Sequence, residues 1–130
     1  MQERRKQPRK NLMSYSQVYD VQSGKLIGYL GDINLIGAMV ISDQSMAVES
    51  TLTISIQLPE LPGTKEETII LPTRVAWCQQ DLSPEYYNVG VEFKIVTEKQ
   101  KAIIDAIMEN YEFRRQAPNY PPRRPEEMDE

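Results

Sequence analysis

Two polar side chains, Asp32 and Asn34, stand two residues apart within residues 31–37, a stretch with a glycine at each end. On an extended backbone they project from the same face, while Ile33 and Leu35 face the other way. Glycine allows the chain to turn, or allows a ligand to approach the backbone closely. The pattern is typical of a polar binding edge. It also suits an ordinary β-turn in which Asp32 and Asn34 bond neighbouring backbone N–H groups.

A second group with binding chemistry is a basic arm near the N-terminus. Residues 3–10 carry five cations against Glu3 alone, a local charge of +4 in a chain of net charge −4: Arg4, Arg5, Lys6, Arg9 and Lys10. Pro8 favours an extended backbone, which keeps the Cα atoms of Arg5 and Arg9 at most about 13 Å apart. A short cationic arm on an acidic body suits a compact anionic ligand better than long DNA or RNA. A solvated terminus without a ligand is the alternative.

Composition excludes several functional classes. The chain of 130 residues has no histidine, and Cys78 is its only cysteine, so neither a disulfide nor a zinc site nor a histidine-based nucleophile relay is expected. We therefore expect a binding protein rather than an enzyme, with no metal and no cofactor. No apolar run approaches the roughly 20 residues that span a bilayer, and no signal-peptide pattern follows the charged start. The sequence predicts a cytoplasmic protein without membrane insertion.

The elements that must position these groups read as about six antiparallel strands. We expect strands at residues 13–20, 26–30, 37–41, 51–58, 67–79 and 87–93, joined by turns rich in Gly, Pro, Asn and Asp. Residues 51–58 alternate strictly, with four aliphatic side chains inward. In residues 67–79, Val75 and Trp77 share one face, Arg74 and Ala76 the other, and Pro72 indicates an edge or a bulge. A mainly β fold, a six-stranded antiparallel barrel, follows.

A C-terminal helix completes the predicted domain. Residues 97–100 have the form of a capping box, and an apolar stripe follows at helical spacing: Ile103, Ile104, Ile107, Met108 and Tyr111. We expect this stripe to pack on the barrel. Residues 116–130 hold four of the nine prolines and are predicted to be disordered. The expected organisation is an arm (residues 1–12), a barrel with its helix (13–115) and a tail (116–130).

In this order, the features resemble the PilZ domain, a bacterial receptor module for cyclic di-GMP. The arm, with Arg5 and Arg9 four residues apart, is similar to that family's RxxxR motif, and residues 32–37 are similar to its [D/N]xSxxG motif. Residues 74–77 and 90–93 look like its VxW and GVxF strands. The resemblance covers about residues 3–111. One departure is Asn34, which stands where the family usually has serine.

The resemblance implies a ligand site on the outer face of the barrel beside the arm. Arg5 and Arg9 match the two motif arginines, and Arg4 matches an additional arginine that often precedes them. Asp32 would accept hydrogen bonds from guanine N1–H and N2–H, and Asn34 would bond the ligand from the next outward position. Gly37 would keep the strand surface open. Trp77, Gly90 and Phe93 are interpreted as core or fold residues, although the edge of the tryptophan could also touch a base.

The implied function is a receptor or adaptor module. Binding of cyclic di-GMP would order the arm and pass a signal to a downstream protein partner in motility, pilus, biofilm or exopolysaccharide control. An alternative is a degenerate member that binds no nucleotide and acts as a protein adaptor, an interpretation motivated by Asn34 and the proline-rich tail. An oligonucleotide-binding barrel is a further alternative, against which the acidic body counts.

Overall fold

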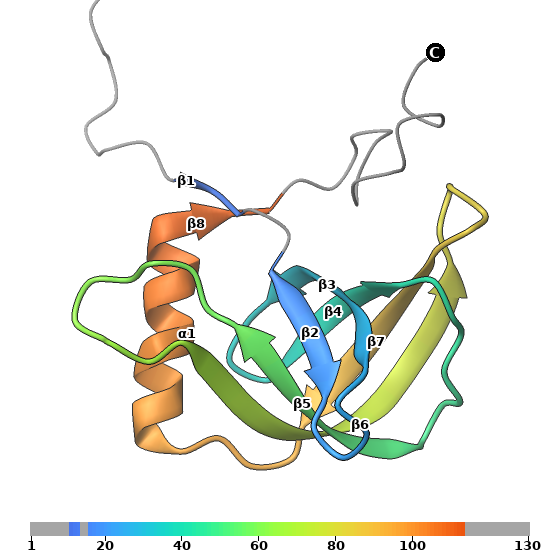
Figure 1. The fold of residues 1–130 in the computed structure, drawn as a ribbon, viewed down its shortest axis with the longest axis horizontal. Helices are drawn as coiled ribbons and strands as arrows, with labels where there is room; N and C mark the ends of the chain where they lie inside the picture. The colour runs from blue at the N-terminus through green and yellow to red at the C-terminus, as the bar shows by residue number, and fades with distance from the viewer. Residues whose placement is uncertain (1–10, 14–15, 114–130) are drawn as a thin grey trace, which may run out of the picture.

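The computed structural model describes residues 11–13 and 16–113. Six strands form a closed barrel in the order β2-β3-β4-β7-β6-β5, and every neighbouring pair in it is antiparallel. A single helix in the described residues, α1 (Glu98–Asn110), lies against one end of the barrel (Figure 1). The predicted mainly β fold is thus confirmed. The strand bounds are β2 (Gln17–Asp20), β3 (Leu26–Ile33), β4 (Gly37–Ser42), β5 (Thr51–Gln57), β6 (Thr68–Gln80) and β7 (Tyr87–Phe93).

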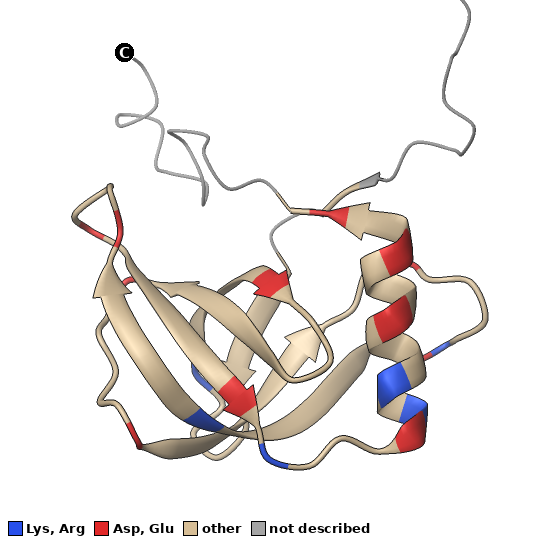
Figure 2. Cartoon of the chain, turned by 180° about the vertical axis from the view of Figure 1, so that it is seen from behind, with Lys and Arg blue, Asp and Glu red and all other residues tan. Residues whose placement is uncertain are grey.

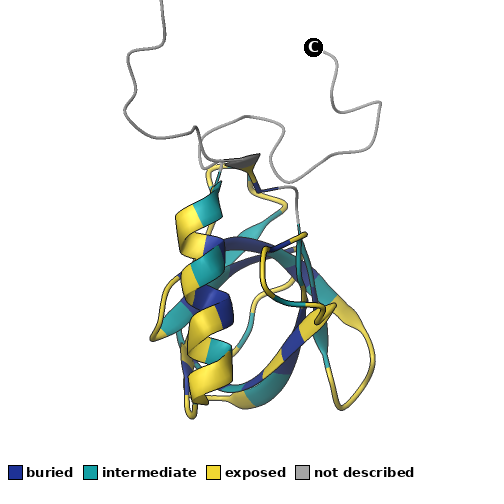
Figure 3. Cartoon of the chain, turned by 90° about the vertical axis from the view of Figure 1, so that its left-hand side faces the viewer, coloured by how far each residue is buried: buried dark blue, intermediate teal, exposed yellow. Residues whose placement is uncertain are grey.

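The core fills the barrel and continues to the inner face of the helix. Ile54 and Ile56 of β5 are fully buried, as the alternation in residues 51–58 predicts. Figure 3 shows buried residues along the barrel strands and on the side of the helix that faces them. Three helix residues belong to this core: Ile103, Ile104 and Ile107. The sequence also placed Met108 in the apolar stripe that packs on the barrel, but Met108 is exposed, so within the helix the buried stripe has one residue fewer than predicted.

The start of α1 has the predicted capping box. The Thr97 side-chain oxygen accepts from the Gln100 backbone N–H at 3.1 Å, and the Gln100 side chain accepts from the Thr97 backbone N–H at 3.0 Å. These two bonds satisfy donors that the first helical turn leaves without intrahelical partners. Within the described residues, no helix is both long enough and apolar enough to span a bilayer.

A short parallel pair of strands, which the sequence pattern did not predict, ties the two ends of the domain together. β1 (Asn11–Leu12) pairs with β8 (Tyr111–Glu112), and the Met13 N–H donates to the Glu112 carbonyl at 2.7 Å. Strands of two residues show no period, so alternation cannot reveal them. The predicted first strand at 13–20 is correspondingly too long, because β2 begins only at Gln17. Arg4, Arg5, Arg9 and the predicted tail lie outside the described residues.

Register shifts in the β3–β4 and β6–β7 ladders change which side chains face outward. In the β3–β4 ladder Leu30 pairs with Val40 and Asp32 with Met39, which leaves Gly31 as an extra residue. A bulge inserts one residue into one strand and so reverses the inside–outside alternation beyond it. Asp32 is consequently half-buried on the outer side, whereas Ile33 enters the core.

The second bulge corrects the prediction for Trp77. Val75 pairs with Val91 and Trp77 with Gly90, so Ala76 is the extra residue in β6. The sequence assigned Val75 and Trp77 to the same face, but Val75 is fully buried whereas Trp77 is 41% exposed. Trp77 is therefore not a core residue. It lies on the outside of the barrel.

The sequence predicted that Pro72, which lacks an N–H, lies on an edge strand or at a bulge, but it lies at neither. β6 is an interior strand of a closed barrel, and its bulge lies four residues further on, at Ala76. Pro72 pairs with Thr53 of β5 on one side, and on the other its carbonyl accepts from the Lys94 N–H at 2.8 Å, one residue after β7 ends at Phe93. Pro72 is tolerated here because it stands where the β6–β7 ladder ends.

Candidate ligand-binding site

A row of four residues crosses the outer face of the barrel from β3 to β6. Asp32 pairs with Met39, Met39 with Gly90, and Gly90 with Trp77. A second row on the same face contains Gly37, Glu92 and Arg74, two residues further along β4 and β7 and three along β6 because of its bulge. Both rows line a cavity of about 330 Å³, to which Asn34 also contributes. The cavity thus brings together Asp32, Asn34 and Gly37, the three predicted site residues that the structure describes.

The Trp77 indole forms one wall of this cavity against the backbone of β7. A Cβ atom at Gly90 would lie 2.2 Å from Trp77 Cε2 and 2.2 Å from Nε1, so the ring occupies the space that any larger residue would need. Glycine at position 90 therefore permits the ring to lie close to the strand. Because Trp77 is only partly covered, the cavity has an aromatic surface on which a planar group can stack.

Asn34 makes the tight turn between β3 and β4. Its side-chain oxygen accepts from the Ile36 N–H at 2.9 Å and the Gly37 N–H at 3.0 Å, and its own N–H donates to the Gly37 carbonyl at 2.9 Å. This is the turn that the sequence offered as an alternative to a binding edge. Leu35 lies in that turn and is 39% exposed, so the prediction that it points inward is wrong. The Asn34 amide NH₂ has no hydrogen-bond partner among the described residues.

Gly37 is required by the approach of β7. A Cβ atom at this position would lie 2.4 Å from the Val91 carbonyl oxygen, which is backbone and cannot move aside independently. The packing of β4 against β7 thus accounts for the glycine at position 37, and the expected role of Gly37 in keeping the strand surface open stays a prediction. Next to this turn, the Asp32 carboxylate accepts from the Ile33 N–H at 2.9 Å, which fixes its orientation at the end of β3.

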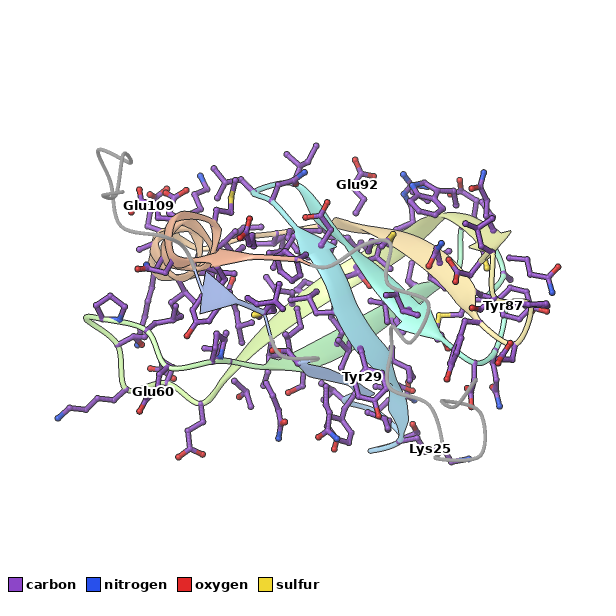
Figure 4. The ribbon with its side chains drawn as sticks, turned by 90° about the horizontal axis from the view of Figure 1, so that it is seen from above. Lys25, Tyr29, Glu60, Tyr87, Glu92 and Glu109 are labelled. Carbon is purple, nitrogen blue, oxygen red and sulfur yellow. The ribbon has the colours of Figure 1, made fainter. Side chains whose placement is uncertain are left out.

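Arg74 is the only arginine in the described part of the chain and lies between two glutamates at the rim of the cavity. Its Nη1 donates to Glu49 Oε2 at 2.8 Å, and its Nη2 donates to Glu92 Oε1 at 2.5 Å. The hydrogen bond with Glu92 and the nearby charge of Glu49 raise the pKa of Arg74, so this side chain remains charged across the physiological pH range. In Figure 4 the labelled Glu92 stands outside the barrel, on the side opposite Tyr29.

Sequence reasoning did not include Arg74, Glu49, Glu92 or Trp77 among the site residues. The prediction that Arg74 lies on the face opposite to Val75 was a usable signal, whereas Glu49 lies in a loop 25 residues away in sequence. Figure 2 shows acidic residues spread over the barrel and the helix. Residues 11–113 contain six Lys and Arg against fourteen Asp and Glu, a net charge of −8. Among described residues, no group of three His, Cys, Asp or Glu is arranged to hold a metal ion.

Comparison with known proteins identifies the family. No curated protein and no solved structure matches the chain. The family model of the PilZ domain, a family of cyclic di-GMP receptors, matches residues 3–110, which include the arm, all six barrel strands and the helix. The family model thus matches most of the chain, and the motif at residues 32–37 lies at a cavity on the outer face of the barrel. The chain belongs to the PilZ domain family.

Proposed function

We propose that this protein is a cyclic di-GMP receptor and that the nucleotide binds in the cavity across β3, β4, β7 and β6. The observation that carries the proposal is the row from Asp32 to Trp77, which combines a hydrogen-bond acceptor and an aromatic surface in one cavity of a PilZ domain. Cyclic di-GMP needs both kinds of contact, since its two guanines have planar π-faces and N–H donors on their edges.

The described residues suit distinct parts of the ligand. Trp77 would stack on one guanine, and Asp32 would accept from N1–H and N2–H of the other. The Asn34 amide NH₂ would donate to a phosphate or ribose oxygen, because its side-chain oxygen is already bonded to the turn. Gly37 would keep the turn in place beside β7.

The charge of the cavity supports a role for the arm. Its charged lining residues are Asp32, Glu92 and Arg74, a net charge of −1, whereas cyclic di-GMP carries two phosphate charges. The positive charge that attracts the two phosphates must therefore come from outside the cavity. The basic arm can supply this charge, and its last cation, Lys10, directly precedes β1. Arg4, Arg5 and Arg9 would close over the bound nucleotide. The ordered arm would then change the surface that a downstream protein partner in the cytoplasm recognises.

Titration calorimetry with cyclic di-GMP tests the proposal, with GTP and cyclic di-AMP as controls. We expect saturable heat with cyclic di-GMP and none with cyclic di-AMP. Because the chain has a single tryptophan, a change in its emission during the same titration would locate the ligand at Trp77. Absence of heat at high micromolar cyclic di-GMP would reject the proposal.

A nucleotide-independent protein adaptor is the second candidate function. The favouring observation is the Asn34 turn, in which the side-chain oxygen is occupied by two backbone donors instead of being available to a ligand. An adaptor would recover the same partner from lysate with and without cyclic di-GMP. A receptor would recover it in a nucleotide-dependent manner.

A further inference from the structure

We propose that Arg74 and Glu92 form a second base-reading pair, a donor and an acceptor that contact the edge of a guanine stacked on Trp77. Glu49 acts as a positioning residue that holds Arg74. This inference rests on the proposed cyclic di-GMP function and assigns ligand contacts to residues outside the two sequence motifs.

The first support is the register of β6 and β7. Arg74 pairs with Glu92 and Trp77 with Gly90, so the ion pair and the indole are neighbours on the same outer face. Gly90 and Glu92 are two residues apart on β7, which corresponds to about 7 Å along the strand. A base that lies on the indole therefore has its edge within reach of Arg74 and Glu92.

The second support is the backbone of Glu49. Its φ is 78°, which makes it the only non-glycine residue with positive φ in the described part of the chain. Two backbone bonds to Val75 hold this conformation, with the Glu49 N–H donating to the Val75 carbonyl and the Val75 N–H donating to the Ser50 carbonyl, both at 2.8 Å. Such strained residues concentrate at functional sites. Here the strain places a carboxylate on Arg74 at the rim of the cavity.

Stability gives little reason for this arrangement. The side chains of Arg74, Glu92 and Glu49 are 33%, 54% and 70% exposed. Ion pairs that are open to solvent to this extent contribute little to folding. The two ion pairs instead hold the Arg74 guanidinium in one position, whereas a free arginine side chain samples many rotamers. They engage one hydrogen of Nη1 and one of Nη2, and the remaining donors are available to a ligand.

Charge decides between a base edge and a phosphate as the group that Arg74 contacts. Arg74, Glu49 and Glu92 together carry −1, which would repel a phosphate. A neutral guanine edge instead offers O6 and N7 as acceptors for the guanidinium and N1–H and N2–H as donors for a carboxylate. Adenine presents an N6 donor beside N7, and this donor would face the arginine. The pair would thus favour guanine over adenine.

Asp32 and this pair would read different guanines. β3 and β6 are three strand spacings apart in the barrel order, about 14 Å. One base cannot contact residues on both strands, whereas cyclic di-GMP has two guanines. The two base-reading positions therefore lie at opposite ends of one cavity.

Calorimetry on four variants tests the inference: Arg74→Gln, Arg74→Lys, Glu92→Gln and Glu49→Gln. We expect cyclic di-GMP affinity to fall about tenfold or more in both Arg74 variants, because lysine keeps the charge but not the forked donors. Glu92→Gln should also lose about tenfold and Glu49→Gln roughly threefold, with unchanged melting temperatures. Lys94→Gln is the control, since Lys94 is an exposed cation that does not line this cavity.

The other outcomes would reject either this inference alone or the inference together with the proposed function. Full affinity in Arg74→Lys, or tighter binding in Glu49→Gln or Glu92→Gln, would mean that Arg74 acts through its charge on a phosphate, and the inference would fail. Unchanged binding in Arg74→Gln, beside a wild-type protein that binds, would reject the inference and leave the proposed function standing. A wild-type protein that binds no cyclic di-GMP would reject both.

Discussion

The indole of Trp77 lies where a side chain at Gly90 would have to be, with ring atoms Cε2 and Nε1 each 2.2 Å from an ideal Cβ position. The pair joins two features that are separate in the sequence, a bulge in β6 and a glycine in β7. The bulge turns the tryptophan outward, and the glycine lets it lie flat against the strand. The aromatic wall of the cavity depends on both.

Gly90→Ala should displace the Trp77 ring without unfolding the barrel, because the ring is on the outer face and can rotate away. We expect a shift in tryptophan emission and about a tenfold loss of cyclic di-GMP affinity, a size typical of one lost base-stacking contact. Trp77→Ala is the matched comparison and should lose a similar amount. An unchanged emission spectrum together with unchanged affinity would show that the ring does not form the binding surface.

Gly37→Ala should destabilise the fold itself. The new methyl group would meet the Val91 carbonyl oxygen at 2.4 Å, so β4 and β7 would have to separate, at a cost of about 1–3 kcal/mol in the free energy of unfolding. Urea denaturation measures this loss. Gly31→Ala is the control, because its nearest neighbour is the terminal methyl of Met39, which can move. A larger loss for Gly31→Ala would contradict the explanation.

Asn34→Ala should remove the side-chain acceptor of the β3–β4 turn. Two backbone donors lose their partner, and we expect the free energy of unfolding to fall by about 1 kcal/mol. Asn34→Ser, which restores the usual residue of the family, retains an oxygen that can accept in the same turn and should lose less than half as much. Equal stability of the alanine variant and the wild type in thermal denaturation would show that the turn does not depend on this side chain.

Arg9→Ala should weaken cyclic di-GMP binding by about tenfold or more, because one forked guanidinium contact to the ligand is lost. Calorimetry gives the change directly. Lys6→Ala removes the same charge from the same arm at a position that is neither of the two motif arginines, and we expect it to have a smaller effect. Equal losses in the two variants would indicate that the arm acts only through its total charge.

The sequence was sufficient for the architecture because the relevant signals are local. Strict alternation revealed β5, and the capping box at Thr97 marked the start of α1. The polar motif at Asp32 and Asn34 lines the cavity, and its role in ligand binding stays a prediction. Each of these signals is contained within a few consecutive residues, so each could be read without knowledge of the rest of the fold.

The remaining features depend on pairing between distant residues. Bulges at Gly31 and Ala76 are defined only by the register of a neighbouring strand, and for this reason alternation assigned Trp77 to the wrong face. Glu49 reaches Arg74 because β5 places its preceding loop beside β6. The roles of Arg4, Arg5 and Arg9 stay predictions.

Closure of the barrel restricts how anything can bind to it. Each of its six strands has a neighbour on both sides, so the backbone of these strands presents no edge to which a peptide could add as a further strand. Recognition at the barrel wall must use side chains and the loops between strands. The same closure protects these strands from edge-to-edge aggregation, which leaves the outer surface free to vary in sequence between one binding task and another.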